Sequence, residues 1–137
     1  MTETTSRKER VLIDESVMDI YRALRTDGDM QVEQAPFSTY KDIFMMAACL
    51  GFRSGRRSSL PGKAASDIRE SVFSESDLAV LKAIAIADSG DVEILSRPGE
   101  VLRISEEFAQ TGIHDLKGNL LHEQGRPLWN LTRMTQK

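Results

Sequence analysis

The chain has 137 residues, of which 40% are hydrophobic and 28% are charged, and its formal net charge is −3. This size and composition are typical of one globular domain that buries enough apolar surface to fold without a metal or a disulfide. The net negative charge excludes a protein that coats nucleic acid over its whole surface, but it permits a local basic patch. The single cysteine, Cys49, rules out a disulfide within the chain and indicates a reducing compartment.

No segment of the sequence looks like a targeting or membrane-spanning element. Residues 1–10 are polar and lack the apolar core of a signal peptide. No apolar run approaches the about 20 residues that are needed to cross a bilayer. We therefore expect a cytoplasmic protein without a membrane partner.

The sequence predicts three regions: a flexible arm over residues 1–10, a single helical domain over residues 11–121 and a C-terminal tail over residues 122–137. Three apolar residues at 11–13 fit either a short strand or the start of a helix. From residue 14 to residue 24 the apolar residues recur with helical spacing, which predicts a helix with one buried face.

A ribbon-helix-helix protein is an alternative for this N-terminal part. In that fold a strand, here residues 10–13, precedes two helices and pairs with the strand of a second subunit to read DNA. The predicted loop over residues 27–38 is long for that motif, so we favour a helical domain without it.

The most apolar segment of the chain predicts a central helix. Thr39 is a suitable N-cap, Asp42 places an acid in the first turn, and Gly51 is a natural C-terminal stop. The eight residues from Ile43 to Leu50 are all apolar. A helix that is apolar on every side has no solvent face, so we expect it in the core, either wrapped by its neighbours or partly covered by a second subunit. The second arrangement predicts a homo-oligomer.

Helical spacing continues through the rest of the chain. The predicted fold class is therefore mainly α, a small single-domain helical bundle around a buried central helix, with one short N-terminal strand as an option. Trp129, in the tail, is expected to dock on its own domain, and a partner is the alternative. The remaining predicted elements are a short helix from Ser66-Asp67, a helix over 77–88 capped by Ser74 or Ser76, one more turn around Val92–Leu95, and a last helix from about Glu100 that Gly112 interrupts.

A basic segment directly after the central helix is the candidate binding site. Its cations are Arg53, Arg56, Arg57 and Lys63, and no acid lies between them. The planar guanidinium group suits phosphate because it can donate two parallel hydrogen bonds. The structural alternative is a solvated loop whose arginines pair with acids of the same chain or cap the central helix. Four cations alone support only weak, salt-sensitive nucleic-acid binding unless an oligomer or a partner adds to them.

The sequence contains no recognisable catalytic or metal-binding pattern. His114 and His122 are too far apart in sequence for a standard zinc motif, and one cysteine cannot build a zinc site. Residues 27–33 alternate like a calcium loop but lack its glycine and its final glutamate. Cys49 lies in an apolar run, where a thiol is unreactive. We therefore expect no metal, no cofactor and no catalytic residues.

Four stretches of the sequence carry a resemblance to known proteins. They are Pro36 to Arg57, Ile68-Arg69, Ala85 to Leu95 and Glu106 to Gly112. In these stretches the chain resembles a family of small accessory proteins encoded beside DNA phosphorothioation (Dnd) systems, which bacteria use against phage. The resemblance implies a defence context and DNA-linked partners, and it supplies no catalytic residues.

Three functions are compatible with these observations. The first is a non-enzymatic accessory protein of a phosphorothioation-type antiphage system that contacts DNA or an acidic partner through the basic segment. The second is a protein–protein adaptor that docks on a larger ATPase or nuclease and never touches DNA. The third is a small enzyme whose site is assembled from residues scattered in sequence.

Overall fold

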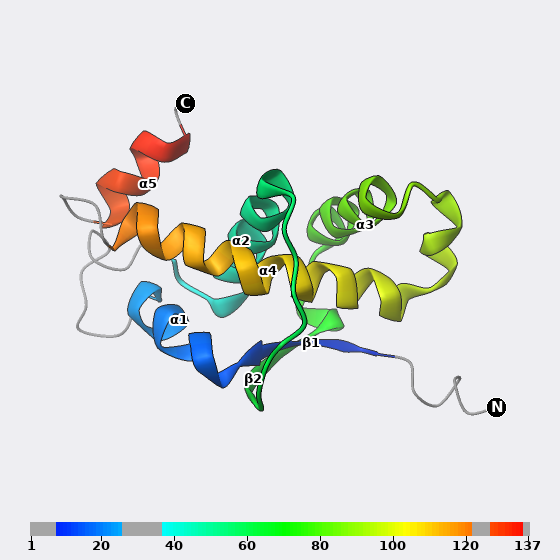
Figure 1. Ribbon diagram of the computed structural model, residues 1–137, viewed down its shortest axis with the longest axis horizontal. Helices are drawn as coiled ribbons and strands as arrows, with labels where there is room; N and C mark the ends of the chain where they lie inside the picture. The colour runs from blue at the N-terminus through cyan, green and yellow to red at the C-terminus, as the bar shows by residue number, and fades with distance from the viewer. Residues whose placement is uncertain (1–7, 26–36, 122–126, 136–137) are drawn as a thin grey trace.

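The computed structural model describes residues 8–25, 37–121 and 127–135. Most of these residues are helical and the only strands among them form a two-stranded ribbon, so the predicted mainly α fold is confirmed (Figure 1). The elements are β1 (Arg10–Asp14), η2 (Glu15–Val17), α1 (Met18–Leu24), α2 (Tyr40–Ser54), β2 (Ala64–Arg69), η3 (Glu70–Val72), α3 (Glu75–Ser89), η4 (Val92–Ser96), α4 (Pro98–Leu120) and α5 (Pro127–Thr135), where η denotes a 3-10 helix.

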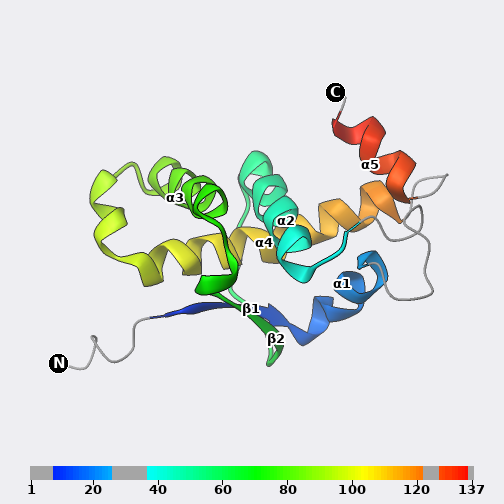
Figure 2. The ribbon, with the colours of Figure 1, turned by 180° about the vertical axis from the view of Figure 1, so that it is seen from behind.

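Helix α4 runs through the middle of the molecule. Helix α2 crosses α4, helices α3 and α5 lie on one side of α4, and α1 and the ribbon lie on the other (Figures 1 and 2). Because neighbours surround it, every residue from Ile104 to Gln110 is buried. The sequence predicted that Gly112 interrupts the last helix. This prediction is wrong, because Gly112 lies inside the continuous helix α4.

The contact between α2 and α4 is made backbone to backbone. A methyl group on Gly112 would lie 1.7 Å from the carbonyl oxygen of Ala47, and one on Gly51 would lie 2.0 Å from that of Phe108. Glycine at both positions is therefore required by the closeness of the two helices. The sequence predicted that Gly51 ends the central helix. This prediction is wrong, because α2 continues to Ser54.

The outward side of α2 is only partly covered. Its inner side buries Ile43, Phe44 and Ala47, which fits the predicted core position. Met45 and Met46 are half-buried, and Cys49 is exposed. The helix ends at Gly55, whose φ of 72° is the left-handed conformation that favours glycine.

The two-stranded ribbon is the main departure from the predicted elements. β1 pairs antiparallel with β2, so that Val11 faces Ile68 and both side chains are buried. The helix predicted from residue 66 is wrong, because one apolar residue in a polar stretch carries no periodicity that separates strand from helix. β1 also pairs within its own chain rather than with a second subunit, which contradicts the ribbon-helix-helix alternative.

Glu106 of α4 fastens the ribbon to the core. Its carboxylate accepts a hydrogen bond of 2.5 Å from the backbone amide of Leu12 and lies 2.8 Å from the ammonium of Lys8. This nearly buried acid therefore satisfies the edge of β1 that β2 does not cover.

Helix α3 begins at Glu75, two residues earlier than predicted, and Ser74, one of the two predicted caps, is its N-cap. The Ser74 hydroxyl accepts a hydrogen bond from the Asp77 amide, and the Asp77 carboxylate accepts one from the Ser74 amide. Asp77 also accepts a 2.8 Å hydrogen bond from Lys41, at the start of α2. One carboxylate therefore caps α3 and ties it to α2.

The tail predicted to be polar contains α5, which packs on the end of α4. Leu131 and Met134 lie against the core, and the Asn130 side chain donates a hydrogen bond to the carbonyl of Leu120. The Trp129 side chain, His122 and most of the predicted 27–38 loop lie outside the described residues, so the expectations that concern them stay predictions.

The backbone contact between α2 and α4 predicts opposite effects for two glycine substitutions in α4. Gly112→Ala pushes the helices apart and is expected to lower the free energy of unfolding by about 3 kcal/mol. Gly118→Ala is the matched control, because a methyl group there meets no atom within 4 Å. The control is expected to gain about 0.5–1 kcal/mol from reduced backbone entropy. Urea unfolding measures both values, and equal effects at the two positions would contradict the close contact.

The Lys41–Asp77 pair predicts a pH-dependent contribution to stability. The hydrogen bond from Lys41, and then that from the Ser74 amide, hold the pKa of Asp77 below its ordinary value of 3.8. A lowered carboxyl pKa stabilises the folded state above the unfolded pKa, and this stabilisation is lost as the pH falls through the folded pKa. Asp77→Asn is expected to cost about 1 kcal/mol at pH 7, and progressively less below about pH 4.

Lys41→Met tests the same pair from the other side. It is expected to cause a similar loss at pH 7, and the double variant is expected to lose less than the sum of the two single variants. Urea unfolding at a series of pH values checks both statements. A loss from Asp77→Asn that does not change with pH would show that the Asp77 charge contributes nothing.

Candidate functional site

The basic segment crosses α4 as a strap, which we define as residues 55–63. It passes on the face of α4 that is turned away from α2 (Figures 1 and 2). The Thr111 hydroxyl donates a 2.5 Å hydrogen bond to the carbonyl of Arg56, and the amide of Ser58 donates one of 3.2 Å to the carbonyl of Glu107. The strap is therefore bonded to α4 by its own backbone.

Two of the four predicted cations form ion pairs within the chain. Arg57 lies 2.7 Å from the carboxylate of Asp88 and 3.3 Å from that of Glu107. Arg56 lies 3.3 Å from the carboxylate of Asp115, which also accepts a hydrogen bond from Ser54. These pairs hold the strap between α3 and α4, as the structural alternative for the arginines anticipated.

The two arginines differ in what they leave accessible. The Arg57 side chain is only 31% exposed and also lies over the ring of Phe108, so its main role is structural. The Arg56 side chain is 66% exposed. Because a guanidinium group has five donors, Arg56 can bind a further anion without releasing Asp115.

The other two predicted cations have no such partners. Arg53, on the last turn of α2, and Lys63, directly before β2, are both exposed. Neither forms an ion pair with any residue that the structure describes. Arg53 lies just before the strap and Lys63 at its end, on either side of α4. The structure therefore brings Arg56 and Arg57 together, but it does not bring all four cations together.

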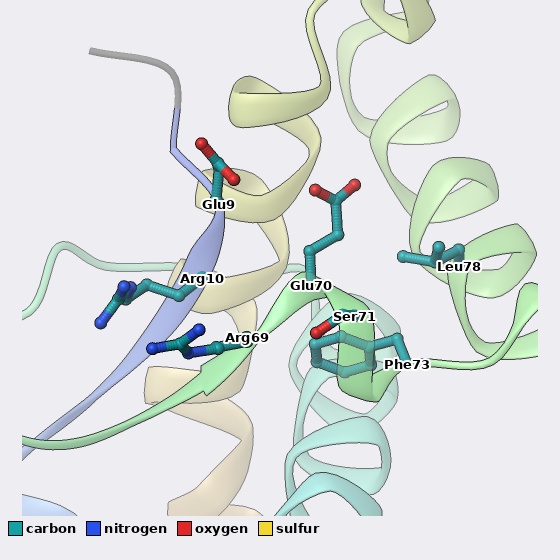
Figure 3. Close-up of a pocket in the computed structure, with 7 residues that line it drawn as sticks. All are labelled: Glu9, Arg10, Arg69, Glu70, Ser71, Phe73 and Leu78. Carbon is teal, nitrogen blue, oxygen red and sulfur yellow. The ribbon is translucent and has the colours of Figure 1, made fainter. Parts of the chain in front are cut away.

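A second pair of cations lies on the ribbon, where the sequence predicted no site. Arg10 and Arg69 are direct cross-strand partners, and both guanidinium groups extend to the same side of the ribbon (Figure 3). Arg10 donates a 2.5 Å hydrogen bond to Asp67. The pair was not predictable because β2 was not recognised as a strand, and only its register places the two arginines opposite one another.

These arginines line part of a cavity of about 380 Å³ between the ribbon and α3. Glu9 and Glu70 contribute acids to the same lining, and Phe73 and Leu78 contribute apolar surface. Figure 3 shows the carboxylates of Glu9 and Glu70 away from the guanidinium groups. With as many acids as arginines in its lining, the cavity has no charge that selects a phosphate group.

Titratable groups elsewhere serve the fold. Burial raises the pKa of Asp14, but hydrogen bonds from Ser16 and from the Gly62 amide outweigh it and leave the pKa below its ordinary value. Although Cys49 is exposed, neighbouring atoms partly shield its thiol from water, which raises the pKa of the thiol and disfavours the reactive thiolate. In the described part of the chain, no three metal-ligating side chains lie close enough together to hold an ion. The described helices also include none with the length and apolar character of a membrane span.

Comparison with known proteins gives one match. No curated protein and no solved structure matches the chain. A family model described as DNA sulphur modification system-associated protein 4 matches residues 10–136, which is nearly the whole chain. This confirms the resemblance to Dnd-associated accessory proteins: the chain belongs to the family of DNA sulphur modification system-associated protein 4.

Proposed function

We propose that the chain is a non-enzymatic accessory protein of a bacterial antiphage system of the phosphorothioation type. In this proposal it works in the cytoplasm and docks, through the basic segment, on an acidic surface of another protein of the system. Such a partner would be a larger component, such as an ATPase or a nuclease. The chain belongs to a family associated with DNA sulphur modification, which supports a role in a system of this type.

The observation that carries the proposal is the contrast among the four cations of the basic segment. Arg57 is held by Asp88 and Glu107, whereas Arg53 and Lys63 have no ion partner among the described residues. Exposed charges without an internal partner contribute little to folding. Arg53, the exposed part of Arg56 and Lys63 are therefore free to recognise carboxylates on another molecule.

A protein partner fits this charge pattern better than duplex DNA does. Asp88, Glu107 and Asp115 lie among the four cations and offset most of their charge. DNA binding depends on neutralising many phosphates at once, so three nearby carboxylates weaken it. Separated cations at the two ends of a strap instead suit isolated carboxylates on a folded surface.

The buried acids support a role without catalysis. Glu106 is engaged by Leu12 and Lys8, and Glu107 lies between Arg57 and Arg103. Each carboxylate is used to join two parts of the fold. A general acid or base would instead need a substrate-facing position in a cavity.

The proposal predicts that two exposed cations control binding to the system. When the chain is co-expressed with the other proteins of its system, the double variant Arg53→Ala, Lys63→Ala is expected to lose co-purification. With the purified partner, calorimetry is expected to give about tenfold weaker binding, because each exposed charge contributes about 0.5–1 kcal/mol. Arg22→Ala, which removes an exposed cation from α1, is the matched control and is expected to bind normally.

Fluorescence anisotropy with duplex DNA provides the other arm of the experiment. The wild-type chain is expected to bind DNA weakly, without a difference between the double variant and Arg22→Ala. Tight DNA binding whose salt dependence falls in the double variant would favour direct DNA contact and overturn the protein partner. Unchanged co-purification of the double variant would overturn the role of the basic segment.

A further inference from the structure

Part of the outer side of helix α3 carries small and apolar residues. The inner side buries Leu81, Ile84 and Ala85 against the core. A surface helix of a globular protein normally turns charged and polar residues to solvent on the other side. On α3 the exposed charges Glu75 and Lys82 instead border a strip of small or apolar exposed residues, which are Ser76, Ala79, Val80, Ala83 and Ala87.

Exposed large hydrophobic side chains gather in the same part of the molecule. Phe52 is the only one that the described residues place elsewhere. The others lie on α3 or on the short helices directly before and after it. They are Val72, 53% exposed, Val80, 41% exposed, Val92, 65% exposed, and Leu95, 40% exposed.

Two charged residues flank this outer side, and neither is used within the chain. Glu75 and Lys82 are seven residues apart, which places them on the same flank of the helix. Both are exposed, and neither forms an ion pair with a described residue. Asp77 and Asp88, on the inner side, are in contrast paired with Lys41 and Arg57.

Small residues form a continuous stripe on the exposed outer side of α3. Ser76, Ala79, Ala83 and Ala87 recur there at intervals of three, four and four residues, which is the spacing of one helix face. Glu75 and Lys82 each directly precede a residue of this series, so they occupy equivalent flanking positions. The small side chains of the series allow a second helix to approach closely.

We propose that α3 pairs antiparallel with α3 of a second copy of this chain. A twofold axis through the contact keeps the same flank of both helices on the same side. Glu75 of one copy then faces Lys82 of the other, and the same pair is formed a second time by symmetry. A parallel arrangement would place each of these charges beside the apolar flank that carries Val80, so the charges select the antiparallel one.

The charge pattern also identifies the occupant of the surface. Glu75 and Lys82 occupy equivalent positions on one helix, so their acid–base pattern is complementary to the same pattern on an antiparallel copy. A twofold interface requires this self-complementarity. This inference goes beyond the proposed function and does not depend on it, because it uses none of the cations of the basic segment.

Charge reversal with complementation tests the pairing. Sedimentation velocity is expected to show a dimer for the wild-type chain. Glu75→Lys and Lys82→Glu are each expected to raise the dimer dissociation constant by about tenfold or more, because each places two like-charge contacts in the interface. An equal mixture of the two variants is expected to form a heterodimer, because every flanking contact then joins opposite charges.

Asp19→Lys, a charge reversal at an exposed position of α1, is the matched control and is expected to remain dimeric. Circular dichroism confirms that each variant is folded. A monomeric wild-type chain, a dimer that neither reversal weakens, or a mixture that stays monomeric would each overturn the α3 pairing. Co-purification of the same variants with the other proteins of the system is measured separately. It tests the proposed function, so a failure of the α3 pairing and a failure of the proposed function can be told apart.

Discussion

The crossing of α2 and α4 is the constraint on which the rest of the structure depends. At Gly51 and Gly112 the two backbones are so close that neither helix has room for a side chain. Gly55 ends α2 one turn beyond this contact, and the strap begins there. Because α2 ends beside α4, the strap has to cross α4 to reach the ribbon, and Arg56 and Arg57 come within reach of acids on α3 and α4. The uncharged contact between α2 and α4 thus determines which acids Arg56 and Arg57 can reach.

Surrounding α4 on both sides has an electrostatic consequence. A helix in this position buries polar residues along with apolar ones, and a buried carboxylate is costly unless it is paired or hydrogen-bonded. Glu106 and Glu107 meet this requirement in different ways, one through the edge of the ribbon and the other through Arg57 and Arg103. Adjacent acids on one helix therefore hold the N-terminal strand and the strap against the same core.

Features that depend on neighbouring residues could be predicted from the sequence, whereas features that depend on residues far apart in the sequence could not. Helical periodicity and the Ser74 cap are local signals, and they located α1, α3 and α4. Gly51 and Gly112 read locally as helix breakers, but the close approach of two helices outweighs the low helix propensity of glycine. β2 could not be recognised because its only strong apolar residue, Ile68, finds its partner 57 residues away at Val11. The basic segment was visible as a cluster, whereas its acids come from three separate places in the chain.

Two pairs of exposed charges without an ion partner among the described residues are the basis of the two proposals. Arg57, Asp77 and Asp88 are consumed by contacts between helices, so their presence is explained by stability alone. Arg53 and Lys63 have no such explanation, and neither do Glu75 and Lys82. The first two are cations separated by the width of α4, which suits scattered carboxylates on a different protein. The second two are an acid and a base on one flank of one helix, which suits a copy of that helix running the other way. Because the two pairs lie on different elements, the two proposals are compatible: a chain that pairs with a second copy through α3 would still present its strap to another component of the sulphur modification system.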